Sequence, residues 1–324
     1  MKWEDVLKQY PEANFLQSPK YAKMHEMIGD KVIMEDFDGK GWALLIVKNA
    51  KRGKLIEIPC GPLIDWNKQA VVKFALERIK EIAKKEKCVF VRIRPQLMAT
   101  EKNIKMLEKN GLKHAPMHLA AEHTVIMDLT KSEDELLAAM RRQTRYDVRR
   151  ATKLGIVVEK TTSEDLFKEF HKVQLKTAKR QNFIPPDQKT LLAEHEAFGE
   201  NAVMYIAKTS DGKPIAYGLI IKDGLEGDYY EAASTDLNRK LPGAYALLWQ
   251  AILDLKAEGY SRFNLWGIAP PGQPNHRYAG VTTFKTGFGG EVVEYIPAHD
   301  LIINKFKYLL DWIVEAARRK KRHL

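Results

Sequence analysis

The sequence has little of several features that would point to a particular class of protein. Its 324 residues include only two cysteines, Cys60 and Cys88, which lie far apart in strand-like apolar runs. This spacing predicts neither a disulfide framework nor a metal site. No apolar run is long enough to span a membrane, and no apolar core of a signal peptide follows Met1. We therefore expect a cytoplasmic protein without a bound metal.

What the sequence has in excess is positive charge. It contains 53 Lys and Arg against 42 Asp and Glu, a formal net charge of +11 at pH 7. This balance favours a polyanionic partner, which is nucleic acid, anionic lipid or a phosphorylated substrate, and does not choose among them. The alternative is a merely basic soluble protein. The hydrophobic content of 45% is ordinary for a globular enzyme, and the length suggests two domains or one large one.

Hydrophobic periodicity predicts alternating helices and strands along the whole chain. In the first part we expect helices over 17–28, 69–85 and 101–110, and strands over 31–37, 42–47, 55–59 and 89–93. From there we expect strands over 123–129, 156–160, 203–208, 215–222, 227–233 and 262–265, and helices over 133–140, 141–154, 163–181, 187–198 and 242–258. An amphipathic helix over 301–319 ends the series, with Ile302, Phe306, Leu309, Leu310, Ile313 and Ala317 on its apolar face. The repeated order looks like a mixed α+β chain of two tandem GNAT-like acyltransferase units, without a letter-for-letter repeat.

The stretch over 266–290, WGIAPPGQPNHRYAGVTTFKTGFGG, is the strongest candidate for a site. Lys285 lies there between Phe284 and Phe288, and Gly287, Gly289 and Gly290 follow it. Glycines allow backbone to approach a ligand closely, and the aromatic rings would desolvate the lysine. A desolvated ammonium is a strong partner for a developing oxyanion. From these residues alone, an anion site and a glycine turn with a surface lysine are equally open.

Five segments together resemble the FemABX family, the aminoacyl-tRNA-dependent transferases that build peptidoglycan side branches. They are 15–19 (FLQSP), 61–63 (GPL), 144–151 (TRYDVRRA), 266–268 (WGI) and 280–290 (GVTTFKTGFGG), and they follow the family's order. The resemblance implies two GNAT-like domains, with the C-terminal helix packing back on the first. The first would comprise 1–122 plus 295–324 and bind the precursor. The second, 123–294, would carry the catalytic lysine and a tRNA-facing basic helix.

The resemblance implies acyl transfer from the 3′ ester of an aminoacyl-tRNA to an amine on the stem peptide of a peptidoglycan precursor, UDP-linked or lipid-linked. An ester is already activated, so direct aminolysis needs alignment rather than a covalent nucleophile, a metal or a cofactor beyond the aminoacyl-tRNA co-substrate. Lys285 matches the family lysine to which the oxyanion role is assigned. Glu231 would either accept the amine proton or pair with a local arginine. The amino acid, the accepting residue and the oligomeric state are not determined by the sequence.

Further site residues follow from the same resemblance. A basic helix would hold RNA phosphates and make binding salt-dependent, the alternative being a solvated cationic face; its residues are Arg142, Arg145, Arg149, Arg150 and Lys153. Lys20 and Lys23 lie where the family places a lysine for the precursor's phosphates, and Lys23 fits better. Substrate contacts are expected from Tyr229, Tyr230, Phe284, Gly287 and Phe288. The basic run 318–322 would contact RNA, contact the inner membrane surface peripherally, or form a solubilising end.

Two departures and two rivals remain. Arg94 stands where some relatives carry aspartate, and Glu231 and Ala232 stand where they favour glycine and alanine, which puts the acceptor and the amino acid in doubt. One rival is an acetyl-CoA-dependent N-acetyltransferase, whose pyrophosphate loop would lie at 239–244, where Pro242 replaces the first glycine. The other is a non-catalytic protein that binds tRNA or membrane with the same fold.

Overall fold

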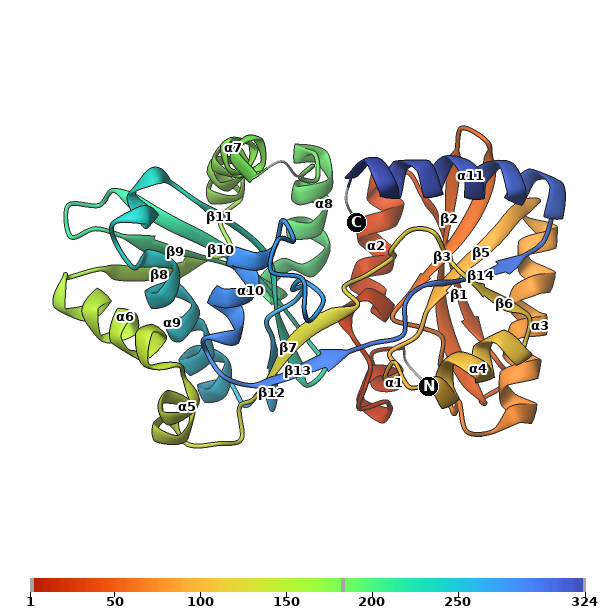
Figure 1. Cartoon of the computed structure of the whole chain (residues 1–324), viewed down its shortest axis with the longest axis horizontal. Coiled ribbons are helices and arrows are strands. Elements are labelled where there is room, and N and C mark those ends of the chain that lie inside the picture. Colours follow the sequence, from red (N-terminus) through yellow and green to blue (C-terminus); the bar gives the residue numbers. More distant parts are fainter. Residues whose placement is uncertain (1–2, 182–183, 323–324) are drawn as a thin grey trace. The chain divides into compact units, whose positions relative to one another are not determined.

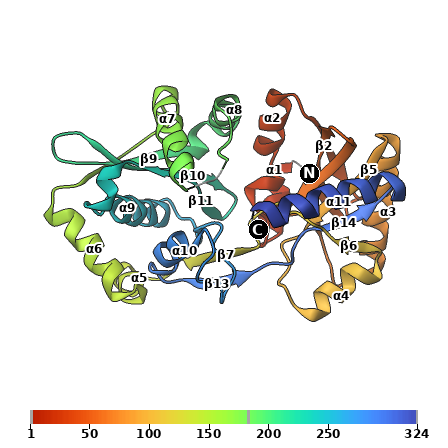
Figure 2. The same cartoon turned by 45° about the horizontal axis from the view of Figure 1, so that its top comes forward.

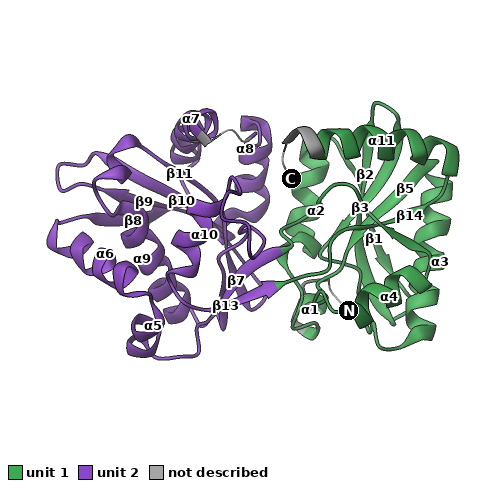
Figure 3. Cartoon of the chain, viewed as in Figure 1, with its two compact units in different colours: residues 1–122, 294–324 green, residues 123–293 purple. Residues whose placement is uncertain are grey.

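The chain forms two compact units in a computed structural model that describes residues 3–181 and 184–322 (Figure 3). Unit 1 comprises Met1–Glu122 and Glu294–Leu324, and unit 2 comprises His123–Val293. Within the described residues each unit has a seven-stranded mixed sheet. The same residues contain no helix that combines the length and the apolar character needed to cross a membrane.

Unit 1 is built on a sheet with the strand order β1-β2-β3-β5-β14-β6, and β4 pairs with β2. The strands are β1 Lys31–Asp36, β2 Gly41–Ala50, β3 Gly53–Pro59, β4 Leu63–Ile64, β5 Cys88–Arg94, β6 Leu112–His114 and β14 His299–Ile302. The helices are α1 Trp3–Gln9, the 3-10 turn η1 Phe15–Gln17, α2 Pro19–Ile28, α3 Gln69–Lys85, α4 Glu101–Lys109 and α11 Lys305–Arg322. The strands β3 and β5 run parallel, and the other pairs are antiparallel.

Strand β5 shows how the sheet of unit 1 is covered on both faces. Val91 and Ile93 lie in the apolar cluster that includes the buried face of α3. Phe90 points the other way, and its ring contacts that of Tyr308 on α11, with centroids 5.4 Å apart. This alternation follows from the two-residue period of a strand. The C-terminal helix α11 therefore lies across the opposite face from α3, as Figure 2 shows in dark blue.

Gln17 joins two of the segments that carried the family resemblance. Its side chain is fully buried, and Nε2 donates to the carbonyl of Pro59 at 2.6 Å while Oε1 accepts from the Leu44 amide at 2.9 Å. A Cβ added to Gly61 would lie 2.6 Å from the same carboxamide. The segments 15–19 and 61–63 therefore pack directly against each other. This packing requires the buried carboxamide of Gln17 and the absence of a side chain at Gly61.

Unit 2 has the strand order β13-β7-β12-β11-β10-β9-β8. Its strands are β7 His123–Asp128, β8 Val157–Thr161, β9 Ala202–Lys208, β10 Pro214–Asp223, β11 Glu226–Ser234, β12 Arg262–Asn264 and β13 Glu291–Glu294. Its helices are α5 Glu133–Ala139, α6 Arg142–Lys153, α7 Glu164–Gln181, α8 Gln188–Phe198, α9 Gly243–Ala257 and α10 Ala279–Thr286, with 3-10 turns η2 Gly199–Asn201 and η3 Asp236–Arg239. The strands β11 and β12 run parallel.

The sheet of unit 2 is also covered on both faces (Figure 1). Ala216 and Ile220 of β10 belong to the main apolar cluster with Leu247 of α9. Tyr217, between them, faces α7, where its ring lies 6.2 Å from that of Phe170 and its hydroxyl bonds Glu169. Helices α5, α6 and α9 thus contribute to one side of the core, and α7 covers the other.

The predicted elements occur within a few residues of their expected bounds, with two corrections. For the glycine-rich stretch around Lys285 an anion site and a glycine turn were both left open and no helix was predicted, but residues 279–286 form the helix α10. Its Gly280 and paired threonines are weak helix formers, so local propensity hides it. The last helix was expected to begin at Leu301, but 299–302 form β14, and α11 begins at Lys305. The short elements α1, β6 and β13 were not predicted.

Candidate active site

Two parallel strands of unit 2 separate close to the predicted site. Pairing of β11 with β12 runs from Glu226 and Arg262 to Asp228 and Asn264, and β11 then continues to Ser234. A bulge lies in β11 where its register on β10 shifts next to Tyr230. Beyond β12 the chain turns sharply at Trp266, whose φ is 61°. Ligands of α/β sheets bind where the carboxyl ends of such strands diverge.

Lys285 lies in the last turn of α10 and points into this region. Its side chain is buried, with 7% exposed, and Nζ donates to the carbonyl of Gly267 at 2.9 Å. The same atom lies 5.7 Å from the centroid of the Tyr229 ring. Among the described residues no carboxylate forms an ion pair with it, and burial lowers the pKa of Lys285 to about 7. An ammonium has three N–H donors, so two are open to a further acceptor.

The aromatic residues next to Lys285 do not surround it as the sequence suggested. Phe284 and Phe288 pack on Tyr245 of α9, with ring centroids 5.0 Å and 5.9 Å away. Phe288 is fully buried in the apolar cluster of unit 2. The expected substrate contact from Phe288 is therefore corrected to a core position, because no surface of its ring is open to a ligand. Tyr230 instead packs on Trp266, at 5.3 Å.

The glycines after Lys285 also have a structural reason. A Cβ on Gly287 would lie 2.3 Å from Thr144 Oγ1, one on Gly289 3.0 Å from the Ala139 carbonyl oxygen, and one on Gly290 2.7 Å from the carbonyl oxygen of Ile126. The Arg141 amide donates to the Gly287 carbonyl at 2.9 Å. We expected these glycines to admit a ligand. They admit neighbouring protein instead, and they join the end of α10 to α5, α6 and β7.

The half-buried Glu231 forms an acidic pair with the buried Glu194. It accepts a hydrogen bond of 2.6 Å from Gln174 Nε2 on α7, and among the described residues it forms no ion pair with arginine. Burial raises the pKa of Glu231 to about 7, against the opposing effect of the Gln174 bond. Burial also raises the pKa of Glu194 on α8, and the negative charge of Glu231 raises it further. Two carboxyls in such a place share protons and titrate as a pair.

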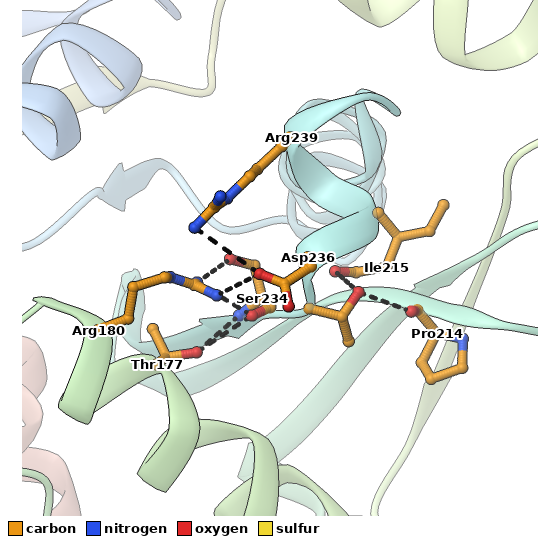
Figure 4. A network of polar contacts seen from close by, with 8 residues as sticks. Thr177, Arg180, Pro214, Ile215, Ser234, Asp236 and Arg239 are labelled. Carbon is orange, nitrogen blue, oxygen red and sulfur yellow. Dashed lines mark hydrogen bonds and ion pairs between the residues drawn. The ribbon is translucent and has the colours of Figure 1, made fainter.

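Helix α7 is fastened to β11 by polar side chains spaced three residues apart, as Figure 4 shows for the end nearer Ser234. Thr177 Oγ1 donates to the Ser234 carbonyl at 3.1 Å, and Arg180 donates to the same carbonyl and pairs with Asp236 at 3.2 Å. Gln174 continues the row to Glu231. Sequence reasoning missed Gln174, Thr177, Arg180 and Glu194. The three-residue spacing is visible in the sequence, but a helical-wheel projection does not show which polar face of a helix is buried.

The five basic residues predicted to bind RNA line one groove along α6, together with Tyr146. In the structure these five residues fall into two groups. Arg145 Nη1 donates to the carbonyls of Leu137, Ala138 and Met140, at 2.9 to 3.1 Å, and so caps α5. Arg150 donates to the Lys240 carbonyl at 3.2 Å. The remaining three have no polar partner within the described chain and are exposed: Arg142, Arg149 and Lys153.

The predicted precursor contacts lie in unit 1. Lys20 and Lys23 are on α2, and Lys23 is exposed. Arg94, the departure at the end of β5, is buried; it bonds Gln96 and the Ala121 carbonyl and stacks over the ring of Tyr295 at 4.8 Å. Arg94 therefore holds two connecting segments of unit 1 together. Of the basic run 318–322, all of which lies in α11, the described side chains are Arg318 and Arg319.

The start of α9 is the place where an acetyltransferase would hold the pyrophosphate of coenzyme A. Its first amides already have acceptors: Gly243 N–H donates to the Leu241 carbonyl at 2.9 Å, and Ala244 N–H to Asn238 Oδ1 at 3.0 Å. A Cβ on Gly243 would lie 2.4 Å from Ile215, so this glycine packs on β10. A phosphate cradle needs free amides at this position. In the described part of the chain no group of His, Cys, Asp and Glu is arranged to hold a metal ion.

Known proteins resemble the chain along most of its length. It is 22% identical over 332 residues to aminoacyltransferase FemA of Staphylococcus epidermidis, covering 76% of this chain and 80% of FemA. It is 27% identical over 230 residues to lipid II:glycine glycyltransferase of Staphylococcus aureus, covering 65% of this chain and 54% of that protein. The crystal structure of FemX superposes with a TM-score of 0.84 at 20% identity, covering 95% of this chain and 97% of FemX.

The FemX match confirms the expected fold, two GNAT-like units in tandem with the C-terminal helix returning to the first. The model of the FemAB family matches residues 2–210 and 187–315. Together these matches confirm the resemblance drawn from the five sequence segments, and the chain belongs to the FemAB family.

Proposed function

We propose that this protein is an aminoacyltransferase that moves an amino acid from aminoacyl-tRNA to an amine on the stem peptide of a peptidoglycan precursor, in the synthesis of cell-wall cross-bridges. The names of its relatives FemA and lipid II:glycine glycyltransferase support transfer of an amino acid to such a precursor. The observation that carries the site is Lys285: a buried ammonium with two open donors, next to the diverging ends of β11 and β12.

The reaction is an aminolysis of the 3′ ester. The lone pair of the acceptor amine attacks the ester carbonyl carbon, and the carbonyl π electrons move to its oxygen. Lys285 Nζ, held by Gly267 and facing the Tyr229 ring, donates a hydrogen bond to that oxyanion. In a site of low dielectric such a donor contributes about 3–4 kcal/mol to the stability of the intermediate. Collapse of the intermediate forms the amide and expels the ribose 3′ oxygen, which takes up a proton.

The attacking amine must lose a proton during this sequence. Glu231 is the acceptor we propose, because its raised pKa makes it a stronger base than an exposed carboxylate. Glu194 stabilises a proton on the pair once it has been transferred, since two adjacent negative charges are unfavourable. Gln174 positions Glu231 through the 2.6 Å bond. Tyr229, Tyr230 and Phe284 are the remaining proposed substrate contacts in unit 2.

The donor is proposed to lie along α6. Arg142, Arg149 and Lys153 leave their charges free to follow phosphates, while Arg145 and Arg150 shape the groove. Lys20 and Lys23 are proposed to contact the precursor's phosphates, and the basic run 318–322 to contact the inner membrane surface. An activated ester needs no cofactor or metal, and we propose none.

The test is an assay with radiolabelled aminoacyl-tRNA pools and both the nucleotide-linked and lipid-linked precursors, with the product identified by mass. Lys285→Ala should lower transfer about 100- to 1000-fold, with RNA affinity changed less than about twofold. Lys256→Ala is the matched control: this partly buried lysine of the same unit also donates to a carbonyl, that of Leu129. Unchanged transfer in Lys285→Ala would remove the oxyanion role.

The two rivals make different predictions in the same experiments. A non-catalytic tRNA-binding protein would bind RNA in a salt-dependent way and give no product with any pairing. An acetyltransferase would bind coenzyme A saturably in a thermal-shift titration. We expect no saturable shift, because the Gly243 and Ala244 amides at the start of α9 already have acceptors within the chain.

A further inference from the structure

Helix α11 places its polar side on the protein and its apolar side in water. Tyr308, Asp311 and Glu315 face the sheet of unit 1. The hydroxyl of Tyr308 donates to Asp300 at 3.0 Å, Asp311 pairs with Arg52, and Glu315 pairs with Arg92 at 2.7 Å. This orientation is the reverse of the usual one, because amphipathic helices commonly bury their apolar face.

The apolar face of α11 is exposed over about two turns. Phe306 is 88% exposed, Leu310 62% and Ile313 52%, and Leu309 and Trp312 are exposed as well. At about 100° per residue these positions form one continuous stripe. Single exposed hydrophobic residues are common, but a contiguous apolar stripe on a helix marks a docking surface. We call this surface, residues 306, 309, 310, 312 and 313, the α11 stripe.

Basic side chains lie at both edges of the α11 stripe, with Lys305 roughly in line with Trp312 at one edge. Lys305 lies about 100° before Phe306 on the wheel, and Lys307 and Arg318 lie about 100–120° after it; all three are exposed. The acidic residues of α11 are Asp311 and Glu315, and both are turned toward the sheet and paired with arginine. In the described part of the helix, the outward side therefore carries apolar and positively charged groups.

We propose that α11 docks on an anionic lipid bilayer, with the α11 stripe among the acyl chains near the headgroups and Lys305, Lys307 and Arg318 at the phosphates. An apolar face bordered by basic residues is the pattern of helices that lie in a membrane interface, and Trp312 is of the type enriched there. A second copy of the chain fits less well, because an antiparallel pairing of two stripes would bring like charges together. The network under α11 keeps the helix parallel to its sheet, so the whole stripe reaches the surface at once.

The docking surface is inferred from the exposure and charge of its residues alone. Its biological role rests on the proposed function, because a docked enzyme would meet a lipid-linked rather than a nucleotide-linked acceptor. Membrane contact through the basic run 318–322 would be electrostatic only. The α11 stripe adds insertion of apolar side chains, so binding should persist in part at high salt.

Co-sedimentation with vesicles tests the docking. The full chain is mixed with equimolar phosphatidylglycerol and phosphatidylcholine, or with phosphatidylcholine alone, without RNA or acceptor. The variant Leu309→Glu/Ile313→Glu is compared with Leu225→Glu/Ile184→Glu, which makes the same two substitutions at exposed positions of unit 2. We expect the wild type to bind anionic vesicles at least tenfold more tightly than neutral ones. The α11 variant should lose at least tenfold, and the control should stay within twofold.

A second variant, Lys305→Gln/Lys307→Gln, should weaken anionic binding several-fold while leaving the salt-resistant part. The proposal is overturned if the wild type does not bind anionic vesicles, or if the α11 variant and the control bind equally. It is also overturned if light scattering finds a wild-type dimer that the α11 variant converts to a monomer, since a second copy would then cover the stripe. Because no substrate is present, these results are independent of whether transfer is found.

Discussion

Each unit buries a positive charge, and the two charges have opposite surroundings. Arg92 of unit 1 is 5% exposed, and its guanidinium bonds both oxygens of Asp300, at 2.8 and 2.9 Å, and Glu315 at 2.7 Å. Lys285 of unit 2 is also buried, and among the described residues its hydrogen-bond partner is one backbone carbonyl, that of Gly267. Burial acts to lower the pKa of both groups. In Arg92 the carboxylates outweigh it and raise the pKa, whereas in Lys285 nothing opposes it.

The difference separates a charge whose partners are fixed carboxylates from one that leaves donors available to a further acceptor. Arg92 joins β5, β14 and α11, and its Nε and Nη2 donate to the fixed carboxylates of Asp300 and Glu315. Lys285 is held in position but left incompletely bonded, which costs stability and keeps donors available. Four experiments test this contrast.

The largest effect is expected from Arg92→Met. It leaves Asp300 buried without its partner, and breaking one side of a buried pair costs about 3–5 kcal/mol. Urea unfolding measures the loss. Arg78→Met is the control, since Arg78 forms an exposed pair with Glu35 and should cost less than about 1 kcal/mol. Equal costs for the two variants would show that the buried network does not stabilise unit 1.

Lys285→Met is expected to stabilise the protein, by roughly 2 kcal/mol at pH 6, because it removes an uncompensated buried charge. The folded pKa of about 7 lies below the ordinary 10.5, so the unfolded chain binds more protons between these values. Wild-type stability therefore rises with pH across that window, and the advantage of the variant shrinks. Unfolding at pH 6 and pH 9 measures this. A variant less stable than the wild type at pH 6 would contradict it.

Lys285→Arg should change the pH dependence of transfer. The wild type needs a protonated lysine and a neutral amine, so kcat/KM should rise with pH and level off above about 7. Arginine stays charged, so in the variant the rise should continue until the amine itself is deprotonated, about tenfold more per pH unit. Measurement of kcat/KM between pH 5.5 and 8.5 tests this prediction. Glu231 titrates in both proteins, so it does not account for a difference between them. Levelling at the same pH in the variant would argue against a charged Lys285.

The smallest effect concerns the same contrast within α6. Arg149 is exposed without a partner in the described chain, so Arg149→Gln should weaken RNA binding a few-fold and lower the salt slope by about 1. Arg145 caps α5, so Arg145→Gln should instead cost about 1 kcal/mol of stability and change RNA affinity less. Binding titrations at several salt concentrations measure both. The reverse ranking would place the RNA elsewhere.

The order of elements was predictable because period-2 and period-3.6 patterns are strong in buried strands such as β5 and helices such as α3. Helix α10 was not, because its residues are poor helix formers and its stability comes from Phe284 and Phe288 packing on α9. The orientation of α11 was also missed: its sequence shows two faces, but the partners of Asp311 and Glu315 are more than 200 residues away.

At the proposed site, the motif pointed to Lys285, whose catalytic role stays a prediction, and the surroundings of its side chain differ from those expected. Adjacent phenylalanines in the sequence suggested desolvation by their rings, yet Tyr229 faces the ammonium and Phe288 lies in the core. Glu231 was a candidate from its strand, but its partner Glu194 comes from a different helix. Contacts between distant segments depend on packing that no local pattern records.

The close contact between α6 and α10 at Gly287 affects how the two helices can move. Because no Cβ separates them, α6 and α10 are tied by the Arg141 amide to the Gly287 carbonyl and by the Arg141 guanidinium to the Thr283 carbonyl, each at 2.9 Å. A displacement of one helix is thereby transmitted to the other instead of being absorbed by a loop. These two hydrogen bonds therefore fix the position of the groove on α6 relative to the ammonium on α10. A ligand bound in that groove would therefore be held at a defined position relative to the Lys285 ammonium.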